Sequence, residues 1–370
     1  MKLTKIALTG FKSIDDLDGQ EIPFGDVTVL LGANGSGKSN LVSFFSLLNH
    51  VTTGALQNYV GRHGVSQLLH YGLKVTESIS FVLHFASDDA QDTYEVKLSR
   101  GLPDRLFVSG EKVTFYKTGS NKAQEYDLDG GGSETGLGKD GRMTSKVVHA
   151  LLSGVRTYQF HDTSDTAKIK DRGYVDDAGY LRSDAGNLAA FLKMLKEHAD
   201  YGRYYDRIVR HIQRVMPQFG DFSLAPLPGN EKYTRLNWTD SMGSDYLFGP
   251  DQISDGSLRF MALTALLLQP PALLPKFIVI DEPELGLHPA AIAHLSSMVK
   301  MVSMNAQILV ATQCTRLVDE FSPDNLVIVE RDPKNRFSIF KKLAVKELDE
   351  WLQRYSLSEL WEKNVLGGQP

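Results

Sequence analysis

The chain has 370 residues, 42% of them hydrophobic, which is enough to bury one large core or two smaller ones. No apolar run approaches the roughly 20 residues of a membrane span, and the alternating start MKLTKIALTGF lacks the apolar core of a signal peptide. The single cysteine excludes an internal disulfide. We therefore expect a cytoplasmic protein with no membrane partner. The formal net charge of -5 excludes a general attraction to nucleic acid, so such a partner would need a local basic patch.

Residues 1–117 are dominated by β patterns. TKIALTGFKSI alternates apolar and polar residues, and the apolar run DVTVLLG is typical of a strand covered on both faces. SNLVSFFSLLNHV then places Leu41, Phe44, Phe45 and Leu48 at helical spacing. ESISFVLHFA, TYEVKL, RLFVSG and KVTFYK follow at short intervals, which predicts an antiparallel meander. We assign residues 1–117 to an N-terminal lobe.

Residues 118–250 have the composition of an insertion. The first part, 118–142, is rich in glycine and polar residues, which favours a mobile surface loop over a second phosphate site. The remainder is irregular and then helical to about Met216, so we expect a mostly helical insertion.

Residues 251–345 return to a periodic pattern. ISDGSLRFMALTALLL predicts a buried helix, and KFIVIDEPE, AQILVATQ and NLVIVERD predict three core strands. We assign this range to a C-terminal lobe that folds onto the N-terminal one. The range 346–370 is then a short amphipathic tail, too small for a fused nuclease domain, and we find no internal repeat.

The clearest motif is the phosphate loop, Gly32-x-x-x-x-Gly37-Lys38-Ser39, which lies between a strand and a helix as this motif requires. Its glycines let backbone N–H groups form an anion nest at the positive end of the helix. Lys38 is expected to reach the β- and γ-phosphates of ATP, and the Ser39 hydroxyl to bind Mg²⁺. The alternative is a glycine-rich turn that binds nothing. The residues that we expect to contact the nucleotide are Gly32, Asn34, Gly35, Gly37, Lys38, Ser39 and Asn40.

A second motif, FIVIDEPE, ends an apolar strand in two carboxylates. Asp281 emerges where open α/β sheets bind their ligands, and would hold the metal directly or through water. Glu282 is the natural group to polarise the attacking water. The alternative is an acidic strand end solvated at the surface.

A third motif, ISDGSLRF, opens the buried helix. A Ser-x-Gly turn offers a hydroxyl and N–H groups to an anion, although an ordinary helix cap by Ser254 or Asp255 explains it equally well when it is considered alone.

The order of these motifs, followed by ILVATQ, resembles the ABC-type ATPases, and more narrowly the RecF/SMC-like group. LTGFKSI is similar to the opening strand of that group, and DEPELGLHP to one of its most recognisable phrases. The resemblance covers roughly residues 1–50 and 251–332. It implies an α/β P-loop NTPase of the ABC/SMC head type, with a mixed sheet, an antiparallel meander and a largely helical insertion.

The resemblance also implies that half of each site lies on another chain. In such ATPases two protomers pack head to tail, so Ser254 and Gly256 of one protomer would complete the site of its partner. Two positions depart from the group. Asp255 stands where a second glycine is usual, and Gln313 stands where a histidine switch is frequent; we take Gln313 as a neutral catalytic partner of the water or γ-phosphate. Gln67 is a weak candidate for the glutamine that usually helps to hold the metal.

Three weaker signals have competing interpretations. Arg203, Arg207, Arg210 and Arg214 form one stripe on a predicted helix, favoured as a solvated face over a surface for DNA or a partner. His161-Asp162 favours a loop pair over a metal phosphohydrolase, which needs more ligands. Cys314 favours a small buried residue over a nucleophile.

These features together predict a Mg²⁺-dependent ATPase that closes as a head-to-tail dimer and acts on DNA or on a separately encoded effector such as a nuclease. The family likeness alone suggests bacterial anti-phage defence, with DNA repair or recombination as the alternative role. A small-molecule kinase or GTPase uses no such turn in trans, and the sequence shows no Asn-Lys-x-Asp guanine motif. A regulatory scaffold that uses ATP only as a clamp remains a further alternative.

Overall fold

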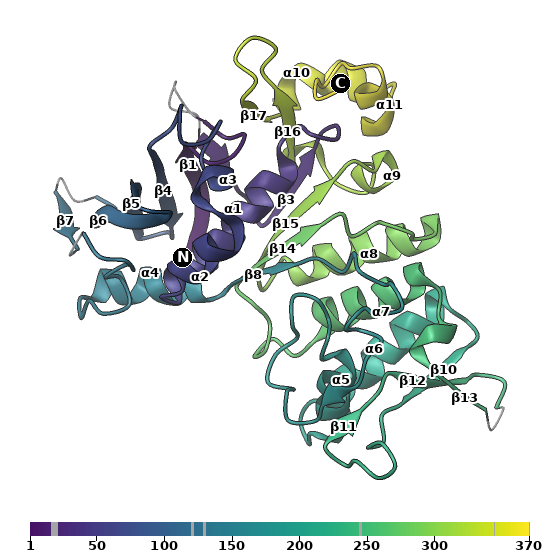
Figure 1. Ribbon diagram of the computed structural model, residues 1–370. Helices are drawn as coiled ribbons and strands as arrows, with labels where there is room; N and C mark the ends of the chain where they lie inside the picture. The colour runs from purple at the N-terminus through teal and green to yellow at the C-terminus, as the bar shows by residue number, and fades with distance from the viewer. Residues whose placement is uncertain (16–20, 120–121, 129–130, 244–245, 344, 370) are drawn as a thin grey trace. The chain divides into compact units, whose positions relative to one another are not determined.

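The computed structural model describes residues 1–15, 21–119, 122–128, 131–243, 246–343 and 345–369 (Figure 1). The chain forms two compact units. Unit 1 contains Met1–Thr157, Lys276–Val279 and Gln307–Pro370, and unit 2 contains Tyr158–Pro275 and Ile280–Ala306. The division falls later in the chain than the composition change at residue 118, because residues 123–157 form elements that remain with unit 1. The functional division expected from the sequence, into residues 1–117, 118–250, 251–345 and 346–370, stays a prediction.

Unit 1 contains an antiparallel sheet with the strand order β2-β1-β4-β5-β6-β7. Neighbouring strands are consecutive in the chain from β4 to β7, so the predicted meander is confirmed. RLFVSG and KVTFYK, expected as two strands, are one continuous strand with a bulge at Ser109, where the register shifts opposite Lys97 and Leu98 of β5. The strands are β1 (Lys2–Thr9), β2 (Glu21–Pro23), β4 (Ser78–Ala86), β5 (Ala90–Gly101), β6 (Arg105–Lys117) and β7 (Ala123–Asp127).

The glycine-rich segment expected as a surface loop is tied to this sheet. Residues 123–127 form β7, and the buried carboxylate of Glu111 on β6 accepts hydrogen bonds from the backbone of Gly136 (2.7 Å) and Leu137 (3.1 Å). Glu134 in turn accepts bonds from the first two backbone N–H groups of α2 (Leu56–His63). The composition does not predict these contacts, because two carboxylates that accept backbone hydrogen bonds are enough to hold a glycine-rich segment in place. The positions 120–121 and 129–130 of this segment lie outside the described residues.

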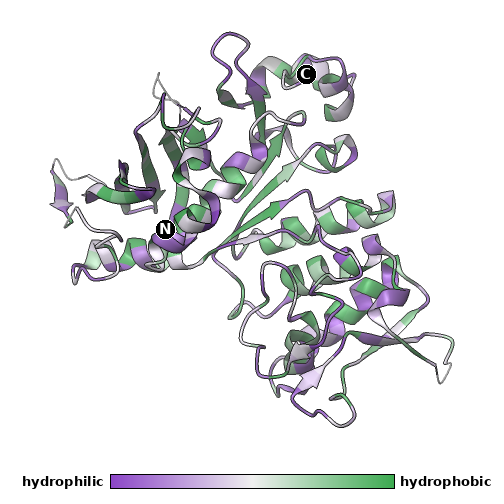
Figure 2. Cartoon of the chain, viewed as in Figure 1, coloured by the Kyte–Doolittle hydropathy of each residue, from purple (hydrophilic) through white to green (hydrophobic). Residues whose placement is uncertain are grey.

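A second sheet has the order β17-β16-β3-β15-β14-β8. β15 and β16 run parallel to β3, whereas β17 is antiparallel to β16, so the expected mixed sheet is confirmed. Each of β3, β14 and β15 is buried along its whole length, and Figure 2 shows them as largely hydrophobic. The strands are β3 (Val27–Leu31), β8 (Val155–Tyr158), β14 (Phe277–Asp281), β15 (Gln307–Thr312), β16 (Leu326–Arg331) and β17 (Ser338–Lys342).

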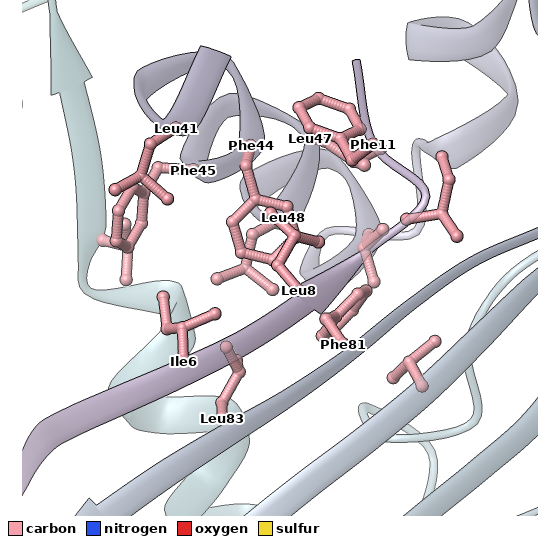
Figure 3. Close-up of a cluster of buried hydrophobic side chains, with 14 of the residues drawn as sticks. Ile6, Leu8, Phe11, Leu41, Phe44, Phe45, Leu47, Leu48, Phe81 and Leu83 are labelled. Atoms are coloured by element: carbon pink, nitrogen blue, oxygen red, sulfur yellow. The ribbon is translucent and has the colours of Figure 1, made fainter. Parts of the chain in front are cut away.

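The core of unit 1 is built around α1 (Lys38–Thr52), the helix predicted after the phosphate loop. Its apolar residues point toward the side chains of β1 and β4 (Figure 3). The rings of Phe44 and Phe81 meet edge to face at 5.2 Å, and those of Phe45 and Phe277 stack at 5.0 Å. This packing fixes the start of α1, and with it the phosphate loop. The remaining helices of unit 1 are α3 (Val65–Leu68), α4 (Met143–Ser153), α9 (Thr315–Val318), η2 (Pro323–Asn325), α10 (Val345–Leu352) and α11 (Leu357–Glu362).

Unit 2 is built on helices with two small sheets. α7 (Asp255–Leu268) is buried at ten of its positions, as its apolar sequence predicted, and α6 and α8 pack against it. The long helical stretch expected before Met216 is two helices, α5 (Leu188–Glu197) and α6 (Gly202–Val215). The other elements are α8 (Pro289–Val302), η1 (Pro250–Gln252), and the sheets β10 (Phe219–Ser223)-β12 (Asn237–Asp240)-β13 (Leu247–Phe248) and β11 (Tyr233–Thr234)-β9 (Gly173–Tyr174). Within the described ranges, the helices include none that is long and apolar enough to span a bilayer.

Candidate functional site

The phosphate loop connects β3 to α1, as its sequence predicted. Gly35 and Gly37 have φ values of +79° and +117°, conformations that favour glycine. Gly37 precedes α1 without a side-chain cap, and the first turn of α1 contains no acidic residue. The helix therefore presents an uncompensated positive end to an anion.

The side chains of the loop differ in exposure. Lys38 is 4% exposed, and its ammonium donates to the carbonyl oxygens of Gly32 (2.8 Å) and Ala33 (3.0 Å). Asn34 and Ser39 are exposed. Asn40, expected to touch the nucleotide, donates instead to the hydroxyl of Ser13 at 2.6 Å. Its side chain thus connects the loop to the LTGFKSI segment.

A buried serine pair supports the loop from outside the motif. Ser338 on β17 is fully buried and donates to the carbonyl oxygen of Ser36 at 2.6 Å, and its hydroxyl lies 2.7 Å from that of Ser13. A Cβ atom on Gly37 would lie 2.0 Å from the Ser338 hydroxyl, and one on Gly32 would lie 2.2 Å from a backbone oxygen of β16. Packing therefore requires both glycines. Sequence reasoning missed Ser338, because nothing in the local pattern of β17 marks it.

The segment after α11 also contacts the loop. The backbone N–H of Ala33 donates to the carbonyl oxygen of Gly368 at 2.9 Å. Gly367 and Gly368 both have φ near +80°, so glycine suits the turn that brings this carbonyl to the loop.

Gln313 immediately follows β15, and the parallel register pairs Thr312 of that strand with Leu31 of β3. Gln313 and the phosphate loop therefore begin at the same edge of the sheet. The next residue, Cys314, is half-buried rather than buried, because it starts the short helix α9 and its N–H bonds to the Thr312 hydroxyl at 2.9 Å.

The acidic strand end lies at the end of β14. Asp281 is 5% exposed, and its carboxylate accepts a hydrogen bond from the amide of Gln159 at 3.2 Å. His161 bonds to the backbone oxygen of Asp281 at 2.9 Å. Glu282 is half-buried and has a φ of +43°, a left-handed conformation that is rare for a residue with a side chain.

Gln159, and not the exposed Gln67 of α3, is the glutamine that meets the Asp281 carboxylate. Its position after β8 explains this contact, because β8 neighbours β14 in the sheet. In the sequence this glutamine stands within TYQFHD, a segment whose pattern predicts only irregular chain. The contact of His161 was also missed, although residues 159–164 are a loop, as expected of the His161-Asp162 pair.

The donors in this region suit Mg²⁺. A carboxylate oxygen of Asp281 and an amide oxygen of Gln159 are hard oxygen ligands, which Mg²⁺ prefers together with phosphate oxygens. The exposed Ser39 hydroxyl of the phosphate loop, in unit 1, is a ligand of the same kind. The described residues contain no cluster of three or more His, Cys, Asp or Glu that would hold a metal by itself. The set therefore fits an ion bound largely through a nucleotide.

The Ser254–Gly256 turn, here called the signature turn, opens α7. Ser254 is the N-cap and accepts the N–H of Ser257 at 3.2 Å, so the capping interpretation is confirmed for Ser254 and not for Asp255. Ser254 and Asp255 are exposed. A Cβ atom on Gly256 would lie 2.0 Å from the carbonyl oxygen of Gly286, so only glycine fits there.

Arg259, one turn into α7, fastens the signature turn to the Asp281 region. Its guanidinium donates to the carbonyl oxygens of Phe160 (3.0 Å), His161 (2.9 Å) and Leu285 (3.2 Å). A further bond reaches the Thr163 hydroxyl at 3.0 Å. Arginine supplies several donors in a fixed fork, which explains how one side chain ties the segments on both sides of Asp281 to α7. Sequence reasoning did not identify this residue.

The predicted arginine stripe lies on α6. Arg203, Arg210 and Arg214 are exposed and Arg207 is half-buried against Met301. None of the four forms an ion pair with another described residue, Asp200 and Asp206 included. Burial, the charge of His294 and then the arginines lower the pKa of His211 to about 4. The three exposed arginines place positive charge on this face of α6.

Comparisons with known proteins identify the family and the fold. Residues 27–319, more than half of the chain, match the family model described as "AAA domain, putative AbiEii toxin, Type IV TA system". No curated protein matches the sequence.

Solved structures of SMC heads share the fold. An Smc head bound to the C-winged helix domain of ScpA has 14% identity and a TM-score of 0.59, and covers 95% of this chain and 100% of its own. An Smc head with an extended coiled coil, bound to the C-terminal domain of ScpA derived from Pyrococcus furiosus, has 16% identity and a TM-score of 0.56, and covers 95% and 98%. The chain thus belongs to the AbiEii-type family of AAA domains and has the P-loop fold of an SMC/ABC-like ATPase.

Proposed function

We propose that the chain is a Mg²⁺-ATP-dependent ATPase that closes as a head-to-tail dimer, acts in the cytoplasm, and couples closure to DNA or to an effector protein in bacterial defence against phages. The observation that carries this proposal is the signature turn. It is exposed, it opens a buried helix, and it packs against Gly286 and is tied to the Leu285 carbonyl by Arg259. Such a turn is a preformed anion site facing outward.

Each half of the site has a distinct role in this proposal. The phosphate loop holds the triphosphate through its backbone N–H groups and Lys38, with Asn34, Gly35 and Asn40 flanking it, and Ser39 binds Mg²⁺. Asp281, whose carboxylate accepts a hydrogen bond from Gln159, is the second proposed ligand of the ion. Ser254 and Gly256 of the partner contact the γ-phosphate. Bound Mg²⁺ would neutralise charge that develops on the phosphate oxygens.

Glu282 orients and polarises the attacking water, and Gln313 bonds to that water or to the γ-phosphate. An amide cannot take up a proton, so Gln313 orients without acting as an acid or base. We therefore expect slow turnover. The alternative, a regulatory scaffold with little turnover, would bind ATP and dimerise in the same way but would hydrolyse ATP very slowly.

Complementation between two inactive variants tests the shared site. Lys38→Ala removes the lysine that holds the phosphates and Ser254→Arg blocks the signature turn, so each homodimer is inactive. In an equal mixture half of the dimers are mixed and each contains one intact site, so about a quarter of wild-type phosphate release should return. A mixture as inactive as its components refutes the shared site. Each variant should keep the wild-type unfolding transition.

A separate variant tests the hydrolytic step. Glu282→Gln should bind ATP, lose phosphate release and accumulate as a dimer in sedimentation experiments with Mg²⁺-ATP. Unchanged turnover would refute the role of Glu282.

The proposed partners follow from two observations. The SMC heads that share this fold were crystallised with domains of ScpA, which makes an effector protein a reasonable partner class for this chain. The exposed arginine stripe favours DNA, because unpaired arginines bind phosphates. Replacing Arg210 and Arg214 with Gln should weaken binding of duplex DNA and flatten its salt dependence, with Lys363→Gln, directly after α11, as the control. Specific binding of repair intermediates would instead favour a role in recombination or repair.

A further inference from the structure

One carboxylate lies just before the signature turn and another within it, where the proposed function places a γ-phosphate. Asp251 precedes the turn in η1, and Asp255 is its middle residue and the first of α7. The Asp255 side chain is 60% exposed. An uncompensated carboxylate at this place would repel the anion that the turn is expected to bind.

The structure supplies each carboxylate with a cation from the preceding part of unit 2. The ammonium of Lys170 lies 4.0 Å from the carboxylate of Asp255, and the guanidinium of Arg235 lies 2.6 Å from that of Asp251. The two cations are joined, because Arg235 also donates to the backbone oxygen of Lys170 at 3.2 Å. The pairs are therefore parts of one arrangement around the turn.

Lys170 differs from an ordinary surface lysine in its burial. Its side chain is only 8% exposed, so the surrounding chain holds the ammonium in place. Lys170 also lies 3.8 Å from the fully exposed Asp165. The pKa of Asp162 is lowered, first by hydrogen bonds from Ser164 and further by the charge of Lys170. Asp162 and Asp165 are hydrated in the loop after His161, whereas Asp255 stands on the signature turn itself.

We propose that Lys170 is a positioning residue that neutralises Asp255 and so lets a signature turn with an aspartate accept the γ-phosphate held by a partner protomer. This inference rests on the proposed function. When the protomers close, Asp255 loses water and its repulsion of the phosphate grows, because charges interact more strongly where water is excluded. Lys170 is already buried beside it and needs no rearrangement to compensate.

The experiment measures dimerisation by sedimentation equilibrium in Mg²⁺-ATP, with full-length Glu282→Gln protein as the parent. Lys170→Met should weaken the dimer by roughly tenfold, which corresponds to about 1.4 kcal/mol. Adding Asp255→Gly to Lys170→Met should restore the dimer, because the charge that needed neutralising is gone. Lys168→Met is the matched control, since Lys168 lies two residues away and pairs with Asp184 at 3.0 Å instead.

ATP affinity of the dilute monomer separates this effect from misfolding. It should be the same in every variant, because the phosphate loop belongs to the other unit of the same chain. If Lys170→Met does not fold, Lys170→Gln carries the same test. A Lys170 variant that dimerises like the parent, or one that Asp255→Gly fails to rescue, overturns the role of Lys170 alone. A parent that does not dimerise in Mg²⁺-ATP refutes the proposed function itself.

Discussion

Replacing Gly256 with alanine gives a direct test of how the signature turn is built. The added Cβ would lie 2.0 Å from the carbonyl oxygen of Gly286 and 2.9 Å from its carbon. Both atoms belong to backbone, so α7 and the Gly286 segment must separate by more than about 1 Å to restore an ordinary contact. Overpacking of this kind costs about 1–3 kcal/mol of unfolding free energy. The same separation stretches the bond from Arg259 to the Leu285 oxygen, now 3.2 Å.

Two assays follow from this. Denaturant unfolding should show the loss of about 1–3 kcal/mol, and ATP-dependent dimerisation should fail while the monomer still binds ATP. The control is Gly61→Ala on α2, where no atom lies within 4 Å of the added Cβ. That change should stabilise the protein slightly, by about 0.5–1 kcal/mol, because alanine favours helix. A Gly256→Ala protein with wild-type stability and wild-type closure would show that this reasoning is wrong.

Three further variants test other parts of the structure. Burial raises the pKa of Asp92 to about 6, so the native state binds a proton more tightly than the unfolded chain, and the unfolding free energy falls as pH rises from about 4 to 6. Asp92→Asn should remove this pH dependence and raise the unfolding free energy at pH 7 by up to about 3 kcal/mol, whereas replacing the exposed Asp88 with Asn should change neither quantity. Ser338→Ala removes the hydrogen bond to the phosphate loop and should weaken ATP binding about fivefold in calorimetry, with unchanged affinity counting against its supporting role. Glu282→Gly relieves the strain of a left-handed backbone and should raise the unfolding free energy by about 1 kcal/mol, while phosphate release is lost. If Glu282→Gln raises the unfolding free energy equally, the backbone is not the cause.

The parts of the fold that the sequence predicted are those encoded by neighbouring residues. Strands such as β3 and β14 are continuous apolar runs, and α1 repeats its apolar residues at helical spacing. The phosphate loop has all its essential residues within one octapeptide. Short-range patterns of this kind determine backbone conformation locally, so they can be recognised without knowledge of the tertiary structure.

The missed features depend on contacts between segments that are distant in the sequence. Gln159 meets Asp281 only because β8 and β14 are neighbours in one sheet, and 122 positions separate the two residues. Arg259 reaches back 99 positions to Phe160. Glu111 likewise anchors a segment that composition predicts to be loose. The topology, and not the local sequence, brings each pair together.

The glycines at the two candidate anion sites are required by the close packing of the chain itself. At Gly32, Gly37 and Gly256 a Cβ atom would collide at 2.0–2.2 Å with other atoms of the chain. Close packing therefore already requires the loop and the turn to have their present backbones, and Lys170 already stands beside the Asp255 carboxylate. If little binding energy is needed to form either half, most of it remains available to join the two protomers. This is the arrangement expected of an ATPase in which the triphosphate acts mainly as the contact between two subunits, and in which hydrolysis ends that contact.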